Sequence, residues 1–113
     1  MSVKHKIAVF ASCFGSNFES ISKAALDGRI NAEVVLLVCD KPQARACRVA
    51  AELGIETFAF SAKDFSSKEE YEGLIVERLR AKGVELIFLA GYMKIVGSTL
   101  LKAFAGRIIN IHP

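Results

Sequence analysis

Residues 7–17 read IAVFASCFGSN, which is a short apolar run, a turn with one glycine, and a polar start for a helix. The uninterrupted apolar run from Ile7 to Ala11 predicts a strand that is covered on both faces, as strands of a parallel sheet are. Gly15 lets the backbone turn sharply or approach a ligand closely, and Asn17 can cap a helix. The stretch therefore predicts the first strand and first helix of an α/β sheet.

The same alternation continues along the rest of the sequence. Short runs rich in Val, Ile, Leu and Phe recur, and stretches with helical spacing separate them. Parallel strands need crossover connections, and a helix in each crossover covers a face of the sheet. The sequence thus predicts an α/β fold with a Rossmann-like, open, mostly parallel sheet and helices on both faces. The further predicted strands are Val34–Cys39, Thr57–Phe60, Leu86–Ala90 and Ile108–Ile111, and the predicted helices run from Asn17 to Leu26, from Ala44 to Leu53, from a capping box at Ser67–Glu70 up to Gly83, and from Ser98 to Phe104.

The composition fits one folded domain over residues 1–113. A chain of 113 residues that is 52% hydrophobic and 24% charged can bury a core but is too short for two domains. Its net charge of +3 comes without a basic run, which argues against a nucleic-acid partner and suits a small anionic ligand. No apolar run approaches the length that spans a bilayer, so no membrane partner is expected.

The three cysteines are Cys13, Cys39 and Cys47. Their spacing fits neither a zinc site nor a disulfide framework, so no metal is expected. Reduced thiols are typical of cytoplasmic proteins, and a cytoplasmic location is therefore the expectation.

Ligands of open parallel sheets bind beyond the carboxyl ends of the strands, where the strand order reverses. In the common strand orders the first and fourth strands are neighbours at this point, and the fifth lies beside the fourth. Gly15, Ser16 and Asn17 then combine a flexible turn, a hydroxyl and the amides of a helix N-terminus, a combination that favours a phosphate. An ordinary strand–helix turn is the alternative. The glycine spacings of dinucleotide sites and of Walker loops are absent.

Other segments at the same edge of the sheet contain further candidate catalytic and ligand-binding residues. Asn110 and His112 point to one side of the last strand, where an amide and an imidazole can stabilise an oxyanion and exchange a proton. Plain surface residues are the alternative. The apolar loop Gly91–Val96 lines a pocket or else packs under the sheet. Asp40-Lys41 follows the second strand, where an acid binds ribose in dinucleotide enzymes, but without the glycine fingerprint it is interpreted as a turn.

Three clusters in register resemble the folate-dependent formyltransferases, and the similarity is greatest to the branch that acts on glycinamide ribonucleotide. The resemblance covers essentially the whole chain. It implies the formyltransferase fold, present up to the fifth strand, with residues 1–113 as its N-terminal, phosphate-binding domain and the C-terminal part of the fold absent. The clusters are Gly15-Ser16-Asn17, Leu89 to Ile95, and Ala105-Gly106-Arg107 running into Asn110-Ile111-His112-Pro113.

The resemblance implies an enzyme that transfers a formyl group from the co-substrate 10-formyltetrahydrofolate to the amine of glycinamide ribonucleotide in purine synthesis. Neither a metal nor a further cofactor is implied. Asn110 and His112 would be catalytic, alongside an acid that lies further on in longer members. Backbone groups at Gly15, Ser16 and Asn17 would hold the substrate phosphate, and Lys68, Met93, Lys94, Ile95, Val96 and Asn110 would bind the folate.

The sequence departs from the family pattern in two places. Cys13 follows Ser12 where relatives usually have glycine, and the catalytic aspartate of the family has no counterpart. The chain alone is therefore expected to be inactive and to pair with a second copy or with a complementary C-terminal half. Methionyl-tRNA formyltransferase and formyltetrahydrofolate deformylase share the Asn-x-His core and stay as alternatives, as does a non-catalytic module that binds phosphate or nucleotides.

Overall fold

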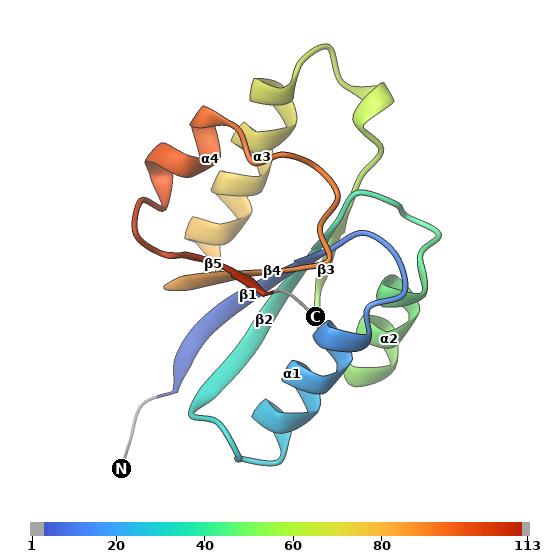
Figure 1. Cartoon of the computed structure of the whole chain (residues 1–113), viewed down its shortest axis with the longest axis vertical. Coiled ribbons are helices and arrows are strands. Elements are labelled where there is room, and N and C mark those ends of the chain that lie inside the picture. The colour runs from blue at the N-terminus through green and yellow to red at the C-terminus, as the bar shows by residue number, and fades with distance from the viewer. Residues whose placement is uncertain (1–3, 112–113) are drawn as a thin grey trace.

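The computed structural model describes residues 4–111 of the chain. Within them, five parallel strands form one sheet in the order β3-β2-β1-β4-β5 (Figure 1). The prediction of an open parallel sheet with covering helices is confirmed. The strands are β1 (His5–Ala11), β2 (Ala32–Cys39), β3 (Thr57–Ala59), β4 (Leu86–Ala90) and β5 (Ile108–Ile111), and the helices are α1 (Ser16–Leu26), α2 (Arg45–Leu53), α3 (Lys68–Ala81), α4 (Ser98–Ala103) and the short 3₁₀ helix η1 (Ala62–Asp64).

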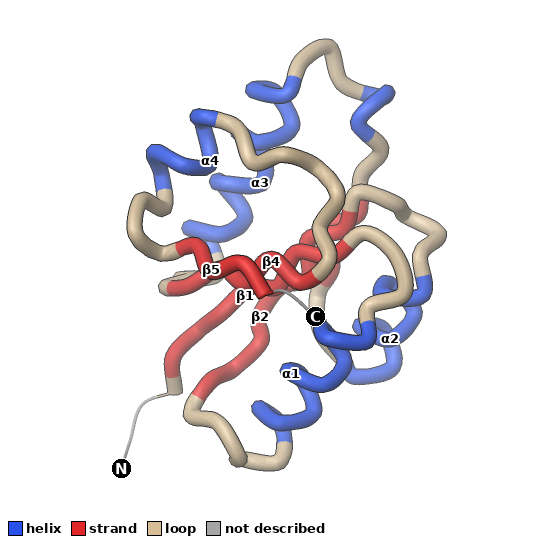
Figure 2. The backbone as a smooth tube through the Cα atoms, in the orientation of Figure 1, coloured by secondary structure: helices blue, strands red, loops and turns tan. Residues whose placement is uncertain are grey.

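The central strand β1 contributes to two hydrophobic cores. Its side chains alternate between the faces of the sheet, so Ile7, Val9 and Ala11 pack with α1 and α2 while Ala8 and Phe10 pack with α3 and α4. All five residues are at most 1% exposed. Figure 2 shows one pair of helices on each side of the sheet. Two covered faces explain why this stretch of sequence is apolar without interruption.

The starts of α1 and α3 can be compared with the capping residues predicted for them. The prediction that Asn17 caps α1 is wrong, because Gly15 occupies the N-cap with a φ of 79° and α1 begins at Ser16. The capping box at α3 is confirmed: Ser67 Oγ accepts a hydrogen bond from the N–H of Glu70 at 3.2 Å. The Glu70 carboxylate accepts the second hydrogen bond of the box from the N–H of Ser66, one residue before the N-cap residue that usually donates it.

The sheet order brings several loops to one edge. β1 pairs with both β2 and β4, and β4 pairs with β5, as the common strand orders predict. The carboxyl ends of these strands therefore open into neighbouring loops, which are residues 12–15 after β1, 40–44 after β2 and 91–97 after β4. Over residues 4–111, no helix combines the length and the apolar character that a membrane crossing requires.

Candidate active site

One partly buried hydrogen bond joins the loop after β1 to the loop after β4. The backbone N–H of Met93 donates to Ser12 Oγ at 2.6 Å, and Ser12 is fully buried. A hydrogen bond of this kind contributes about 0.5–1.5 kcal/mol to stability, and it helps to hold the two loops in position relative to each other. The predicted phosphate loop and the predicted folate loop consequently lie side by side.

Gly15 is required by the backbone and by packing against α2. Its φ of 79° lies in the left-handed region, and a Cβ at this position would lie only 2.7 Å from the Cβ of Ala46. The N–H of Ala46 also donates to the carbonyl oxygen of Cys13 at 3.2 Å. α1 has no side-chain cap within the described residues, so the N–H groups at Ser16 and Asn17 extend from an open helix end. Such an end attracts anions.

Arg45, the first residue of α2, holds the same loop from outside. Its guanidinium donates to the carbonyl oxygen of Phe14 at 3.2 Å and pairs with Glu19 at 2.8 Å. The guanidinium carbon also lies 4.2 Å from the centre of the Phe14 ring. Hydrogen bonds from Arg45 and then from Lys23 hold the pKa of the Glu19 carboxyl below its ordinary value. Sequence patterns did not point to Arg45, because a contact with a loop 31 residues earlier in the chain leaves no local pattern.

The loop after β4 presents apolar side chains to water. Met93 is 70% exposed and Ile95 is 81% exposed, so the alternative that both pack under the sheet is wrong. Val96, by contrast, is partly buried against the core beneath α3 and α4. Lys68 Nζ donates to the carbonyl oxygen of Ile95 at 2.6 Å, which brings this predicted folate residue to the loop. Exposed apolar side chains beside a cation suit a flat ligand with an acidic group.

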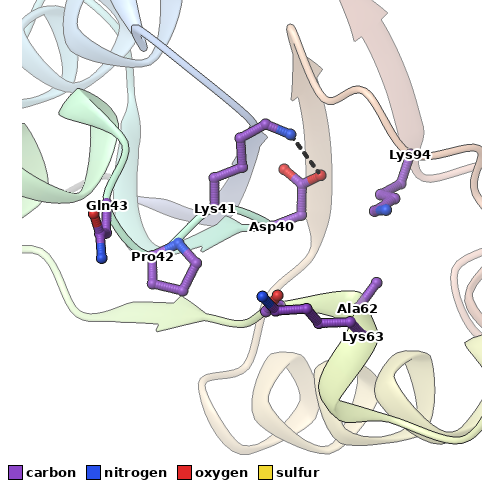
Figure 3. A pocket seen from close by; sticks show the side chains of 8 residues that line it. Asp40, Lys41, Pro42, Gln43, Ala62, Lys63 and Lys94 are labelled. Carbon is purple, nitrogen blue, oxygen red and sulfur yellow. Dashed lines mark ion pairs between the residues drawn. The ribbon is translucent and has the colours of Figure 1, made fainter.

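Lys94 lines a pocket of about 570 Å³ at the end of β2 (Figure 3). The pocket also includes Asp40, whose side chain is 0% exposed and whose two oxygens have no hydrogen-bond partner in the described part of the chain. The interpretation of Asp40-Lys41 as a simple turn therefore missed a feature. Its signal was an acid placed directly after a buried strand. The other lining residues are Lys41, Pro42, Gln43, Ser61, Ala62 and Lys63.

Asn110 lies on β5, opposite Leu89 of β4, and is exposed. His112 lies outside the residues that the structure describes. The pairing of Asn110 with His112 at one strand end therefore stays a prediction.

Behind the loops, burial keeps several weak acids protonated. It raises the pKa of the Cys39 thiol to about 12. Burial also raises the pKa of Tyr92, with the neighbouring Tyr71 and the charge of Asp40 adding to it. Cys13, like the other two cysteines, is a free thiol. Across residues 4–111, no group of three or more His, Cys, Asp or Glu side chains has the arrangement of a metal site.

The chain is similar to known proteins over nearly its whole length. A family profile described as formyl transferase matches residues 5–113. The phosphoribosylglycinamide formyltransferase of Bacillus subtilis is 51% identical over 96% of this chain and 55% of its own length, and the chloroplastic enzyme of the same name from Arabidopsis thaliana is 40% identical over 97% and 38%.

A solved structure is similar to this chain over the same extent. Glycinamide ribonucleotide transformylase 1 from Geobacillus kaustophilus superposes with a TM-score of 0.95 at 45% identity, over 97% of this chain and 58% of that one. The chain thus spans little more than half the length of the bacterial proteins it matches.

Proposed function

Because the chain belongs to the formyl transferase family, we propose that the whole protein transfers a formyl group from 10-formyltetrahydrofolate to the amine of glycinamide ribonucleotide in purine synthesis. The observation that carries this proposal is the 51% identity with a bacterial phosphoribosylglycinamide formyltransferase, which extends over 96% of this chain.

We assign the phosphate of glycinamide ribonucleotide to Gly15, Ser16 and Asn17. The support is a helix N-terminus without a side-chain cap, which follows a glycine with a left-handed backbone. Its N–H groups and the Ser16 hydroxyl offer donors to a dianionic group. The guanidinium of Arg45 adds positive charge beside this loop while it keeps its hydrogen bond to the Phe14 carbonyl oxygen.

We assign the folate co-substrate to the neighbouring loop. The exposed side chains of Met93 and Ile95 offer apolar surface to an aromatic ring, and backbone groups as far as Val96 offer hydrogen bonds. Lys68 and Lys94 supply the cations that the acidic end of a folate needs. Asn110 completes the assignment at the neighbouring strand end, where a ligand on this loop would meet the reacting groups.

The proposed chemistry is an acyl transfer. The substrate amine attacks the formyl carbon, a new C–N bond forms, and the carbonyl oxygen becomes an oxyanion. The side-chain N–H of Asn110 and a protonated His112 stabilise that charge. The bond to N10 then breaks as His112 passes its proton to N10, and the proton lost by the amine goes to a carboxylate base. These steps need only proton transfer and oxyanion stabilisation, so we propose that no metal takes part.

We further propose that this activity requires the part of the family length that the chain does not span. The family resemblance implies a catalytic acid that lies further on in longer members, in the part of their length that the chain does not span. The outer edge of β5, where Ile109 is 43% exposed, is a surface on which a complementary C-terminal half or a second copy can pair. The proposal places the protein in the cytoplasm, where its thiols stay reduced.

The test is a formyl-transfer assay with the full-length protein. It should convert glycinamide ribonucleotide and 10-formyltetrahydrofolate into formylglycinamide ribonucleotide and tetrahydrofolate. His112→Ala should lower kcat by roughly 10²–10⁴, the usual range for a general acid–base group. The 113-residue chain alone should be inactive and should regain activity when mixed with a complementary C-terminal half. Full activity of the isolated chain, or wild-type kcat in His112→Ala, would contradict the respective part of the proposal.

A further inference from the structure

Asp40 is a buried carboxylate without a hydrogen-bond partner among the described residues. Its side chain is 0% exposed, and neither oxygen accepts a hydrogen bond from the described residues. The nearest cation is Lys41 Nζ at 4.0 Å, which is too long for a hydrogen bond. Buried carboxylates of this kind are costly unless a donor reaches them, so the arrangement is one that a ligand with hydrogen-bond donors would complete.

The surroundings of Asp40 favour negative charge. Lys41, Lys63 and Lys94 line the same pocket, and they come from the loop after β2, from η1 and from the loop after β4. Figure 3 shows the Lys41 amine next to the Asp40 carboxylate, with Lys63 and Lys94 on other sides of the pocket. A simple anion would be repelled by Asp40, and a simple cation would be repelled by the lysines. The ligand that fits both must carry neutral donors and a separate anionic group.

The volume of the pocket and its position at the sheet edge indicate which class of ligand it binds. The pocket volume of about 570 Å³ lies in the middle of the range for small-molecule sites. Asp40 follows the end of β2, next to the central strand, where an acid binds ribose hydroxyls in doubly wound sheets. A ribose supplies a pair of hydroxyl donors, and a phosphate supplies the negative charge.

We propose that this pocket binds a ribonucleoside monophosphate, whose 2′ and 3′ hydroxyls donate hydrogen bonds to Asp40 and whose phosphate pairs with Lys63. The site is separate from the phosphate loop at Gly15, because it lies at the end of β2 and not at the end of β1. Lys41 is 53% exposed along its side chain, so its amine can swing aside as the hydroxyls take its place at Asp40.

The experiment compares two probes by calorimetric titration of the full-length protein. They are adenosine 5′-monophosphate and its 2′,3′-dideoxy analogue. The wild-type protein should bind the ribonucleotide at least about tenfold more tightly, the effect of losing hydrogen bonds to a charged group. Asp40→Asn should abolish most of this preference, while Asp27→Asn, which changes an exposed carboxylate at the end of α1, should leave it intact.

Lys63→Gln should weaken both probes by a similar factor, since it removes a phosphate contact and leaves Asp40 in place. Lys63 is exposed, so this variant keeps the proposal testable even if Asp40→Asn fails to fold. Equal affinity of the two probes for the wild-type protein, a preference retained in Asp40→Asn, or displacement by equimolar inorganic phosphate would each overturn the proposal. None of these readouts depends on formyl transfer.

Discussion

Glu72 of α3 holds Gly97 at the start of α4: its Oε2 accepts a hydrogen bond from the Gly97 N–H at 2.7 Å. The second oxygen accepts from the N–H of Leu100 at 3.2 Å. Glu72 is 2% exposed, and Gly97 has no side chain with which to cap the helix. Since α4 follows the proposed folate loop directly, this carboxylate fixes where that loop ends.

Glu72→Ala should therefore destabilise the protein by about 3 kcal/mol, because it leaves two N–H groups at the start of α4, one buried and one partly buried, without acceptors. Glu72→Gln keeps one oxygen acceptor and should lose about half as much. Urea unfolding at pH 7 measures both values. Glu77→Ala, on an exposed position of the same helix, serves as the control and should change the stability by less than about 0.5 kcal/mol. Equal midpoints for the Glu72 and Glu77 variants would show that the contacts contribute nothing.

Gly15→Ala should destabilise the protein through two separable effects. One is the left-handed backbone, which costs an alanine about 1–2 kcal/mol. The other is the overlap with Ala46, whose Cβ lies 2.7 Å from the added atom. Gly28→Ala is the matched control, since Gly28 has nearly the same φ of 77° and nothing within 4 Å of an added Cβ. The Gly15 variant should be less stable than the Gly28 variant by more than about 1 kcal/mol in thermal unfolding.

This comparison also bears on how the phosphate assignment is tested. A bulky residue at Gly15 disturbs the packing of α2 as well as any phosphate, so a raised KM in such a variant has two causes. Ser16→Ala removes only a hydroxyl donor from an exposed position and is the cleaner change. If the two glycine variants were equally stable, the contact with Ala46 would be easily relieved. A raised KM in a Gly15 variant would then report on phosphate binding alone.

The fold followed from the sequence because burial on two faces leaves a local pattern. The run from Ile7 to Ala11 is apolar at every position since α1 with α2 covers one side and α3 with α4 covers the other. Helix ends were less predictable. Asn17 has the usual chemistry of a cap, but the glycine before it takes the cap position because only glycine fits against Ala46.

Residues of the candidate site could be predicted only where their neighbours in the sequence make them stand out. Met93 and Ile95 stand out as apolar residues in a loop; their exposure excludes packing under the sheet, and their place in a ligand pocket stays a prediction. Arg45 and Asp40 could not be found in the same way. The role of Arg45 depends on a contact with Phe14. The role of Asp40 depends on its carboxylate having no hydrogen-bond partner among the described residues. Both features depend on three-dimensional packing, although the position of Asp40 directly after a buried strand was a signal in the sequence.

The cysteines should differ strongly in reactivity. Cys13 is exposed, whereas Cys39 is buried and its thiol pKa is raised to about 12 by burial. The thiolate is the reactive form, so iodoacetamide at pH 8 should label Cys13 and leave Cys39 unmodified until urea is added. Mass spectrometry of tryptic peptides measures this. Labelling of both at equal rates in the native protein would show that the core around Cys39 opens readily.

The same shift has a consequence for stability at high pH. Because the folded-state pKa of Cys39 lies above its ordinary value of 9.0, the unfolded chain loses this proton first as the pH rises. The contribution of the neutral thiol is therefore fully present below pH 9 and is lost progressively towards pH 12. Cys39→Ala should lessen this alkaline decline in the unfolding free energy, and Cys13→Ala should not change it.

Arg45→Gln should impair binding of the phosphate-bearing substrate more than catalysis. The variant loses the ion pair with Glu19 and the guanidinium contact with Phe14, so the loop before α1 is no longer held from α2. Under the proposed function, KM for glycinamide ribonucleotide should rise roughly tenfold, the size of one lost charge-assisted contact, while kcat and the KM for the folate change little. Arg48→Gln is the matched control, because Arg48 lies on the same helix and only its guanidinium contact to the Gln43 carbonyl, at 3.4 Å, is lost. Steady-state kinetics with each substrate varied in turn separates these outcomes. A fall in kcat without a change in either KM would mean that Arg45 acts on the reacting groups and not on the phosphate loop.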